Sequence, residues 1–198
     1  MPSFVVAISG ASGAVYGVRL LEYLLKEKYR VYLTLTHEAR FIIRDELGLE
    51  WGAHFSETAE ILKKRYADFD LVYCDEKEMT APIASGSVPT QGMIVAPCSM
   101  KTLAAIAHGF SSNLIERAAD VTLKEKRPLL LIPRETPLSP VHLRNMLTLS
   151  EMGATLIPAM PAFYHHPRSI EDMIDFIVGR VLDSLKIENR IYQRWKES

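Results

Sequence analysis

Short apolar runs alternate with amphipathic segments along this chain. Residues 4–8 are apolar at every position, which is typical of a strand buried on both faces in the middle of a parallel sheet. Five later runs have a similar character and are predicted to be strands: residues 31–36, 71–74, 93–96, 128–133 and 155–157.

Between these runs, apolar residues recur at helical spacing. In residues 15–28, Val18, Leu21 and Leu25 share one face, and Lys26 and Lys28 suit the negative C-terminal end of a helix. Further helices are predicted at residues 37–47, 57–66, 103–108, 141–152 and 170–185, with one more that starts after a cap at Ser111 or Ser112 and ends near residue 126. This alternation predicts an α/β protein with a doubly wound, mostly parallel sheet, whose ligands bind beyond the carboxyl ends of the strands. We expect one domain over residues 1–190 and a C-terminal tail over residues 191–198.

Composition narrows the class of protein. The 198 residues carry a formal charge of −1, so nothing in the overall balance indicates binding to nucleic acid or a membrane surface. No apolar run approaches the roughly 20 residues that span a bilayer, and the N-terminus lacks the pattern of a secretory signal. The two cysteines, Cys74 and Cys98, match no metal spacing, so we expect a cytoplasmic protein without a bound metal.

The first candidate site is the small-residue loop after the first predicted strand, which includes Gly10, Ala11, Ser12 and Gly13. Small residues allow a sharp turn that brings backbone N–H groups to a phosphate or a ring edge at a helix N-terminus. The spacing is not the three-glycine dinucleotide fingerprint, and the second strand ends at Thr36 rather than at an acidic residue that would hold a ribose. A mononucleotide therefore fits better than a dinucleotide. The alternative is that the glycines only allow tight packing of strand and helix.

Other polar residues also follow predicted strands. Ser99 and Thr102 place hydroxyl groups at the start of a helix, where an anion can bind, although an ordinary helix cap explains them equally well. Arg134 and Glu135 pair a cation with a proton-transfer group at another strand end, with a surface ion pair as the alternative. Cys98 lacks an identifiable base and is expected to be a small buried apolar residue.

Six motifs, in this order, resemble those of the flavin prenyltransferase family, and together they span nearly the whole chain. They are residues 9–13 (SGASG), 84–87 (ASGS), 97–102 (PCSMKT), 117–125 (RAADVTLKE), 133–137 (PRETP) and 161–165 (PAFYH). The resemblance implies a flavodoxin-like fold that binds FMN. It also implies transfer of a dimethylallyl group from dimethylallyl monophosphate to the reduced FMN, without a metal. The resulting prenylated FMN would serve a partner decarboxylase, and the protein would be a homo-oligomer, a dodecamer built from trimers with active sites at subunit contacts.

The resemblance also assigns roles to single residues. The implied FMN contacts are Gly10, Ala11, Ser12, Thr36, Ser99, Met100, Lys101, Thr102, Arg117 and Arg134. The implied prenyl-phosphate site consists of Lys124, Arg134, Tyr164 and Arg180, with Ser85 and Met79 near the prenyl chain. Ser12, Glu46, Glu135 and Lys124 are the implied catalytic groups, with the two carboxylates as acid and base. Several relatives have tryptophan at the position of Met79, so this chain loses an aromatic face that could steady an allylic cation.

Two other functions remain open on the sequence alone. An FMN-dependent decarboxylase of the peptidyl-cysteine or phosphopantothenoylcysteine type shares the fold and the flavin loop. Those enzymes use a histidine base, and no histidine follows Gly13 at the start of the first helix. The other alternative is a non-catalytic flavin carrier or decarboxylase subunit.

Overall fold

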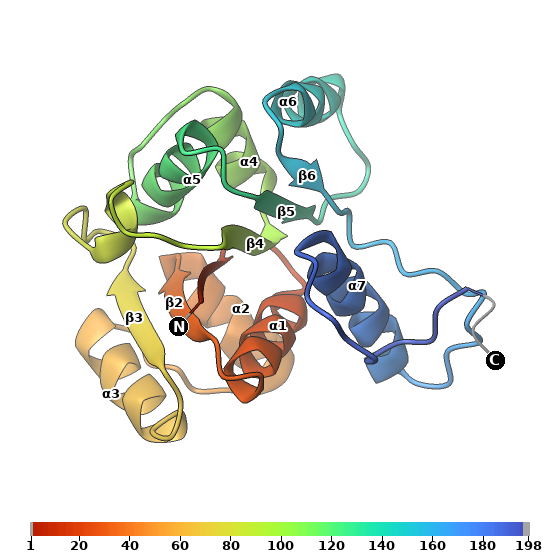
Figure 1. The fold of residues 1–198 in the computed structure, drawn as a ribbon, viewed down its shortest axis with the longest axis horizontal. Coiled ribbons are helices and arrows are strands. Elements are labelled where there is room, and N and C mark those ends of the chain that lie inside the picture. Colours follow the sequence, from red (N-terminus) through yellow and green to blue (C-terminus); the bar gives the residue numbers. More distant parts are fainter. Residues whose placement is uncertain (1, 196–198) are drawn as a thin grey trace.

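The computed structural model describes residues 2–195, which form a parallel β-sheet with helices on both faces (Figure 1). The sheet order is β3-β2-β1-β4-β5-β6, and each neighbouring pair is parallel. The strands are β1 (Ser3–Ile8), β2 (Arg30–Leu35), β3 (Leu71–Asp75), β4 (Gly92–Cys98), β5 (Leu129–Pro133) and β6 (Thr155–Leu156). The order changes direction at β1, as in other doubly wound sheets, so the predicted fold class is confirmed.

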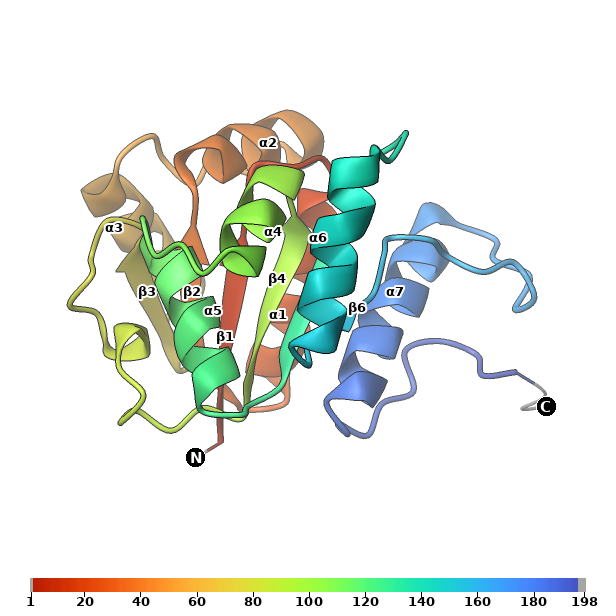
Figure 2. The same ribbon diagram turned by 90° about the horizontal axis from the view of Figure 1, so that it is seen from above.

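The α-helices are α1 (Ala14–Lys26), α2 (His37–Leu47), α3 (Phe55–Arg65), α4 (Met100–Ala107), α5 (Leu114–Lys124), α6 (Pro140–Glu151) and α7 (Ile170–Ser184). A 3-10 helix, η1 (Pro82–Ala84), lies in the small-residue loop after β3 and has no counterpart among the predicted helices. Figure 2 shows α4, α5 and α6 in front of the sheet and α1 behind it.

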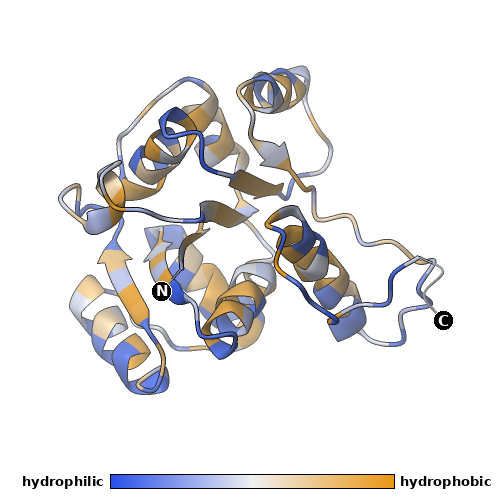
Figure 3. Cartoon of the chain, in the orientation of Figure 1, coloured by the Kyte–Doolittle hydropathy of each residue, from blue (hydrophilic) through white to orange (hydrophobic). Residues whose placement is uncertain are grey.

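The core consists of two apolar layers, one on each face of the sheet. Side chains of β1 alternate between them, with Val6 and Ile8 in the layer under α1, α2 and α7, and Val5 and Ala7 in the layer under α4 and α5. The hydropathy colouring of Figure 3 follows the same division, because the strands and the inward faces of the helices are the most apolar parts. A strand covered on both sides must be apolar throughout, which explains the continuous runs in the sequence.

The predicted starts of α4 and α5 were wrong. Helix α4 begins at Met100, directly after its cap Ser99, rather than at residue 103. The cap of α5 is Asn113, not Ser111 or Ser112, because the Asn113 side chain accepts from the Glu116 N–H at 2.9 Å. The Glu116 carboxylate in turn accepts from the Ser112 N–H at 2.7 Å. The helix ends at Lys124 rather than near residue 126, since Lys126 adopts a left-handed φ of 56°.

The C-terminal segment packs against the rest of the protein as far as the structure describes it. After α7 the chain turns back, and Ile187 and Asn189 are buried. Residues 196–198 of the predicted tail lie outside the described residues.

Candidate active site

The carboxyl ends of β1, β2, β4 and β5 lie side by side, so the loops that follow them meet at one edge of the sheet. Ser9 joins two of these loops. Its backbone N–H and its hydroxyl both donate to the Pro97 carbonyl, at 3.2 and 2.9 Å, and its hydroxyl accepts from the Ser99 N–H at 2.7 Å. The first and third polar motifs of the sequence therefore form one connected structure.

Arg134 connects this structure to the end of β5. Its guanidinium Nε donates to the Ser12 carbonyl at 3.2 Å, and its backbone N–H donates to the Cys98 carbonyl at 3.4 Å. Because one donor of the guanidinium holds the Ser12 loop, the remaining donors of the fork can bind an anion.

Gly10 lies unusually close to the start of α2. A Cβ at Gly10 would come within 2.7 Å of the Glu38 Cβ and 3.7 Å of the Thr36 hydroxyl, so only glycine fits this approach. The pKa of the Glu38 carboxyl lies below its usual range because its own backbone N–H bonds to it, an effect larger than that of its burial. The Thr36 hydroxyl and the charge of Lys101 also lower the pKa. Glu38 is a member of this cluster that the sequence analysis missed, and its only signal there was an acidic residue in the first turn of a helix.

Ser99 caps α4, as the alternative explanation in the sequence analysis held. Its hydroxyl accepts from the Thr102 N–H at 3.2 Å and lies 3.0 Å from the Thr102 hydroxyl. The N-terminal amides of α4 and the Lys101 ammonium nevertheless lie at the same sheet edge as Arg134, which makes this helix end an attractive place for an anion.

Glu46 occupies the N-terminal end of α1, where the small-residue loop was expected to cradle a phosphate. Its carboxylate accepts from the Gly13 N–H at 2.9 and 3.1 Å and from the Ala14 N–H at 3.0 Å. These amides lack partners within the helix, and a carboxylate satisfies both their donors and the helix dipole. In this structure the Glu46 carboxylate therefore occupies the two amides on which the sequence predicted a phosphate.

A second group of predicted residues lies on α5 and beside η1. Arg117 donates to the Ala84 carbonyl at 3.1 Å and pairs with Asp120 at 2.9 Å. Lys124 pairs with Glu125 at 2.7 Å. A Cβ placed on Gly86, which follows Ser85, would lie 3.1 Å from the Lys124 ammonium. Met79, in the loop before η1, is exposed.

A third group of predicted residues lies beside α7. The Tyr164 ring packs edge-on against Phe176 at 5.8 Å and Trp195 at 5.0 Å. Arg180 points from α7 with about half of its side chain exposed and makes one contact of 3.4 Å to the Asp183 carboxylate.

The second and third groups are not brought together in one chain. Helix α5 belongs to the layer on one face of the sheet, and α7 packs in the layer on the other face. Figure 1 shows the two helices apart, with β4 and β5 between them. The predicted prenyl-phosphate residues Lys124, Tyr164 and Arg180 therefore cannot bind one phosphate within a single protomer.

Glu135 follows Arg134 at the end of β5 and borders a cavity. Its carboxylate accepts from the Thr136 N–H at 3.0 Å. The cavity, about 290 Å³ in volume, is also lined by Arg134, Met146 and Met160. A carboxylate beside a guanidinium in such a cavity is placed to exchange a proton with a bound ligand.

The cysteines have no such role in the structure. Cys98 is fully buried, and burial raises the pKa of its thiol far above the ordinary value. Cys74 is buried as well, with a pKa raised to about 12 by burial. Within residues 2–195, no three His, Cys, Asp or Glu side chains are grouped as a metal site would require. In the same range, no helix has the length and apolar character of a membrane span.

The fold and the edge site define a class of protein: a doubly wound α/β protein that binds a mononucleotide where the strand order reverses. The family model described as Flavoprotein matches residues 2–182. Flavin prenyltransferase UbiX of Alkalihalophilus pseudofirmus is 49% identical, over 97% of this chain and 95% of the relative. Flavin prenyltransferase UbiX of Methanothermobacter thermautotrophicus is 50% identical, over 96% of this chain and 94% of the relative. The chain belongs to the flavin prenyltransferase family of flavoproteins.

Solved structures agree with this assignment. AnUbiX (PadA1), in complex with FMN and dimethylallyl pyrophosphate, is 43% identical with a TM-score of 0.88, and the match covers 100% of this chain and 98% of that one. A dodecameric FMN-dependent UbiX-like decarboxylase from Escherichia coli O157:H7 is 42% identical with a TM-score of 0.87, covering 98% and 99%. A phosphopantothenoylcysteine-type (PPC) decarboxylase mutant is 20% identical with a TM-score of 0.62, so it shares the fold alone.

The sheet edge fits FMN by its own chemistry. Two hydroxyls (Thr36 and Thr102), the amides at the start of α4 and the Lys101 ammonium form a donor set for a phosphate. The close approach at Gly10 keeps the loop against the start of α2 and beside the Thr36 hydroxyl, and Arg134 supplies a cation for a reduced flavin.

Proposed function

We propose that this protein transfers a dimethylallyl group from dimethylallyl monophosphate to reduced FMN. The observation that carries the proposal is the linked edge of β1, β4 and β5, where Arg134 and Ser9 hold the flavin loop against the start of α4. Membership of the flavin prenyltransferase family supports the same reaction, as does the relative whose structure contains FMN and dimethylallyl pyrophosphate.

In this proposal the FMN phosphate binds at the start of α4, because Glu46 already satisfies the amides of α1. Ser99, Met100, Lys101 and Thr102 provide amide, hydroxyl and ammonium donors there, and Thr36 adds a hydroxyl from the end of β2. The flavin ring then lies along the loop of Gly10, Ala11 and Ser12, with Arg134 beside it. Arg117 reaches this FMN from α5 of a neighbouring protomer.

We propose that the prenyl-phosphate site forms between two subunits of a dodecamer. Lys124 and Ser85 come from one protomer, and Tyr164 and Arg180 from another, since the fold separates them within one chain. Exposed apolar side chains support an interface beside Tyr164: Met160, Phe163 and Ile170 are each about two thirds exposed or more. Met79 contributes to the wall around the prenyl chain.

The reaction breaks the bond between the allylic carbon and the phosphate oxygen. Reduced FMN supplies the electron-rich ring that accepts the prenyl carbon. Lys124, Arg180 and the Tyr164 phenol stabilise the charge that grows on the departing phosphate. Both carboxylate oxygens of Glu46 already accept from the Gly13 amide at the start of α1. The Glu135 carboxylate, next to Arg134, accepts from the Thr136 N–H through one oxygen. We therefore assign the proton transfer to Glu135. Ser12, held through its carbonyl by Arg134, faces the reacting ring.

The test is an anaerobic incubation of the reduced FMN complex with dimethylallyl monophosphate, followed by mass spectrometry of the released flavin. We expect the mass of a dimethylallyl adduct in the wild type and its loss in Glu135→Gln, with FMN still bound. Recovery of unmodified flavin from the wild type would exclude the proposed reaction. Full activity of Glu135→Gln would instead remove only the role of that carboxylate.

Subunit mixing tests the shared site. Lys124→Ala and Arg180→Ala should each be inactive alone, because each leaves one half of every site empty. Dissociation and reassembly of the two variants together should restore up to about one quarter of the activity, since some interfaces then carry both intact halves. No recovery in mixed oligomers would contradict a site built from two protomers.

The proposed product of the reaction is prenylated FMN. We propose that the prenylated FMN is released to a partner decarboxylase in the cytoplasm. Addition of the purified reaction mixture to an apo-decarboxylase of aromatic acids should restore carbon dioxide release, and the flavin mixture without prenyl phosphate serves as the control.

A further inference from the structure

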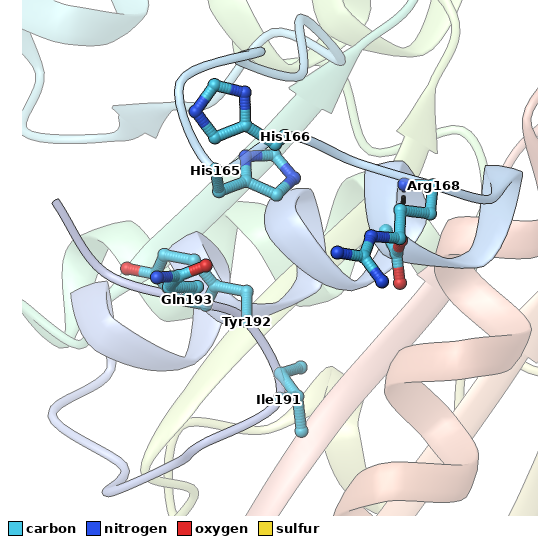
Figure 4. Close-up of a pocket in the computed structure, with 7 residues that line it drawn as sticks. His165, His166, Arg168, Ile191, Tyr192 and Gln193 are labelled. Atoms are coloured by element: carbon cyan, nitrogen blue, oxygen red, sulfur yellow. Dashed lines mark hydrogen bonds between the residues drawn. The ribbon is translucent and has the colours of Figure 1, made fainter. Parts of the chain in front are cut away.

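The C-terminal segment after α7 folds back along that helix. The Tyr192 ring lies directly over Gly179, where a Cβ would overlap the ring. Trp195 packs edge-on against Tyr164 at 5.0 Å. Figure 4 shows Tyr192 and Gln193 across from His165 and His166, and together they line a cavity of about 360 Å³. Trp195 thus contacts Tyr164, and Tyr192 bonds to Arg180, so the segment reaches both of these residues that the proposed function places on the prenyl phosphate.

Asp183 on α7 anchors this segment through several donors. Arg194 donates two hydrogen bonds to its carboxylate, at 2.6 and 2.9 Å. The Tyr192 hydroxyl donates at 2.5 Å, and the Asn189 amide donates at 2.9 Å. Burial raises the pKa of Asp183, but the bonds from Arg194, Tyr192 and Asn189 outweigh it, so the pKa lies below the usual value. Asp183 is thus a carboxylate ion that requires cationic partners.

Arg180 and Arg194 compete for this one carboxylate. Arg180 is three residues before Asp183 on the same helix, a spacing at which arginine and aspartate readily pair. In the structure Arg194 holds the carboxylate by a two-bond fork, and Arg180 is left with one contact of 3.4 Å to it. Arg180 also lies beside the Tyr192 hydroxyl, and the hydrogen bond between them is the main reason that the pKa of Arg180 is raised. The Asp183 side chain is only 16% exposed, so the loss of Arg194 would leave a largely buried anion without its closest cation. Arg180 is then the nearest replacement.

We propose that Arg194 is a positioning residue that occupies Asp183 and thereby keeps Arg180 available for an anionic phosphate. The proposal rests on the proposed function, because it takes Arg180 as a ligand of the prenyl phosphate. It adds a residue that touches no substrate and acts through a competition between two cations for one carboxylate. The docked C-terminal segment is what brings Arg194 to that carboxylate.

The test uses Arg194→Met, which keeps the apolar stem and removes the charge. The affinity for dimethylallyl monophosphate is measured by calorimetry on the oxidised FMN complex, and KM and kcat are measured on the reduced enzyme. We expect Arg194→Met to weaken binding and raise KM about tenfold, the scale of one charge-assisted hydrogen bond, with kcat changed less than twofold. FMN affinity should not change, which shows that the variant is folded.

The decisive measurement is the double variant Arg194→Met with Asp183→Asn. Once the carboxylate is neutral it no longer captures Arg180, so we expect prenyl-phosphate affinity to return to within about threefold of wild type. A merely structural role for Arg194 predicts the opposite, because the double variant loses both anchors of the segment. Failure of Asp183→Asn to restore the affinity would overturn the proposal.

Gly179→Ala provides an independent perturbation that alters no charge. The new methyl group displaces Tyr192 and the segment with it, while alanine favours the helix itself. We expect a weaker affinity for the prenyl phosphate that Asp183→Asn again restores. If Arg180→Ala weakens binding but Arg194→Met does not, only the positioning role fails. If Arg180→Ala has no effect on binding, the assigned phosphate site and the positioning role both fail.

Discussion

Gly17 controls how closely α1 can approach the sheet beneath the flavin loop. A Cβ at this position would overlap the backbone carbonyl oxygen of Ala96 on β4 and come within 2.8 and 2.9 Å of two carbons of Ile8. The carbonyl belongs to a buried strand and cannot rotate away as a side chain could. Gly17→Ala therefore forces α1 away from the sheet.

Two effects of Gly17→Ala oppose each other. Alanine improves the helix by up to about 1 kcal/mol relative to glycine. Overpacking of a buried contact costs about 1–3 kcal/mol, and an obstacle made of backbone favours the upper part of this range. We expect a net loss of about 2 kcal/mol in the free energy of unfolding, which corresponds to a Tm lower by about 4–8 °C in a chain of this size. FMN affinity should also fall, because the loop that starts α1 moves with the helix.

Urea unfolding and thermal melts of the FMN-free protein measure the loss, and flavin fluorescence measures the affinity. Gly179→Ala is the comparison, since it makes the same change inside α7 against the Tyr192 side chain, which can move with the C-terminal segment, and its Tm should fall less than that of Gly17→Ala. Addition of Ile8→Val to Gly17→Ala should recover less than half of the lost stability, because the Ala96 carbonyl remains. A Gly17→Ala protein as stable as wild type would refute the reasoning.

Three further predictions follow from single residues. Glu46→Ala removes the acceptor of the Gly13 and Ala14 amides and should lower the free energy of unfolding by about 1 kcal/mol. Thermal melts should then show a Tm lower by about 2–4 °C, with a smaller decrease for Glu46→Gln. An unchanged Tm would argue against the capping role. Burial raises the pKa of Cys74 to about 12 and that of Cys98 further. Neither thiol should react with iodoacetamide before unfolding, and since only the unfolded chain ionises them near pH 8.5, stability should decline as the pH rises above that value; rapid labelling of the native protein would contradict this. Met79→Trp should raise kcat/KM for dimethylallyl monophosphate about two- to fivefold through a cation–π contact, and a lower value would speak against Met79 as part of the prenyl wall.

Much of the fold could be predicted from the sequence because burial on two faces leaves a clear pattern. Residues 4–8 and 128–133 are apolar throughout, and β1 and β5 lie at these positions in the central part of the sheet. The start of α5 was predicted less well, because Ser111, Ser112 and Asn113 are all good caps and only the bond to Glu116 selects Asn113.

The candidate site shows where such patterns stop being informative. Ser99 and Arg134 could be placed near the flavin loop, because both follow strands whose ends share one edge. Glu46 could not be recognised as the cap of α1, since it lies 33 residues from Gly13 and reaches it only through the packing of α1 against α2. Because this packing brings Glu46 to the α1 amides, the proposed site has the FMN phosphate at the start of α4 instead of at the start of α1.

The sequence by itself determined the class of fold, the order of the polar loops and the family, because local periodicity and short motifs depend only on residues that are close together in the chain. Only the tertiary structure decided which groups compete for the same partner. The bond from the Ala14 amide to Glu46 joins two helices that are distant in the sequence. The bond from Arg194 to Asp183 forms because the segment after α7 folds back along that helix. Such contacts depend on distances of a few ångströms between packed elements. The placement of Lys124 and Arg180 on opposite faces of the sheet depends on the connections between all of the strands and helices.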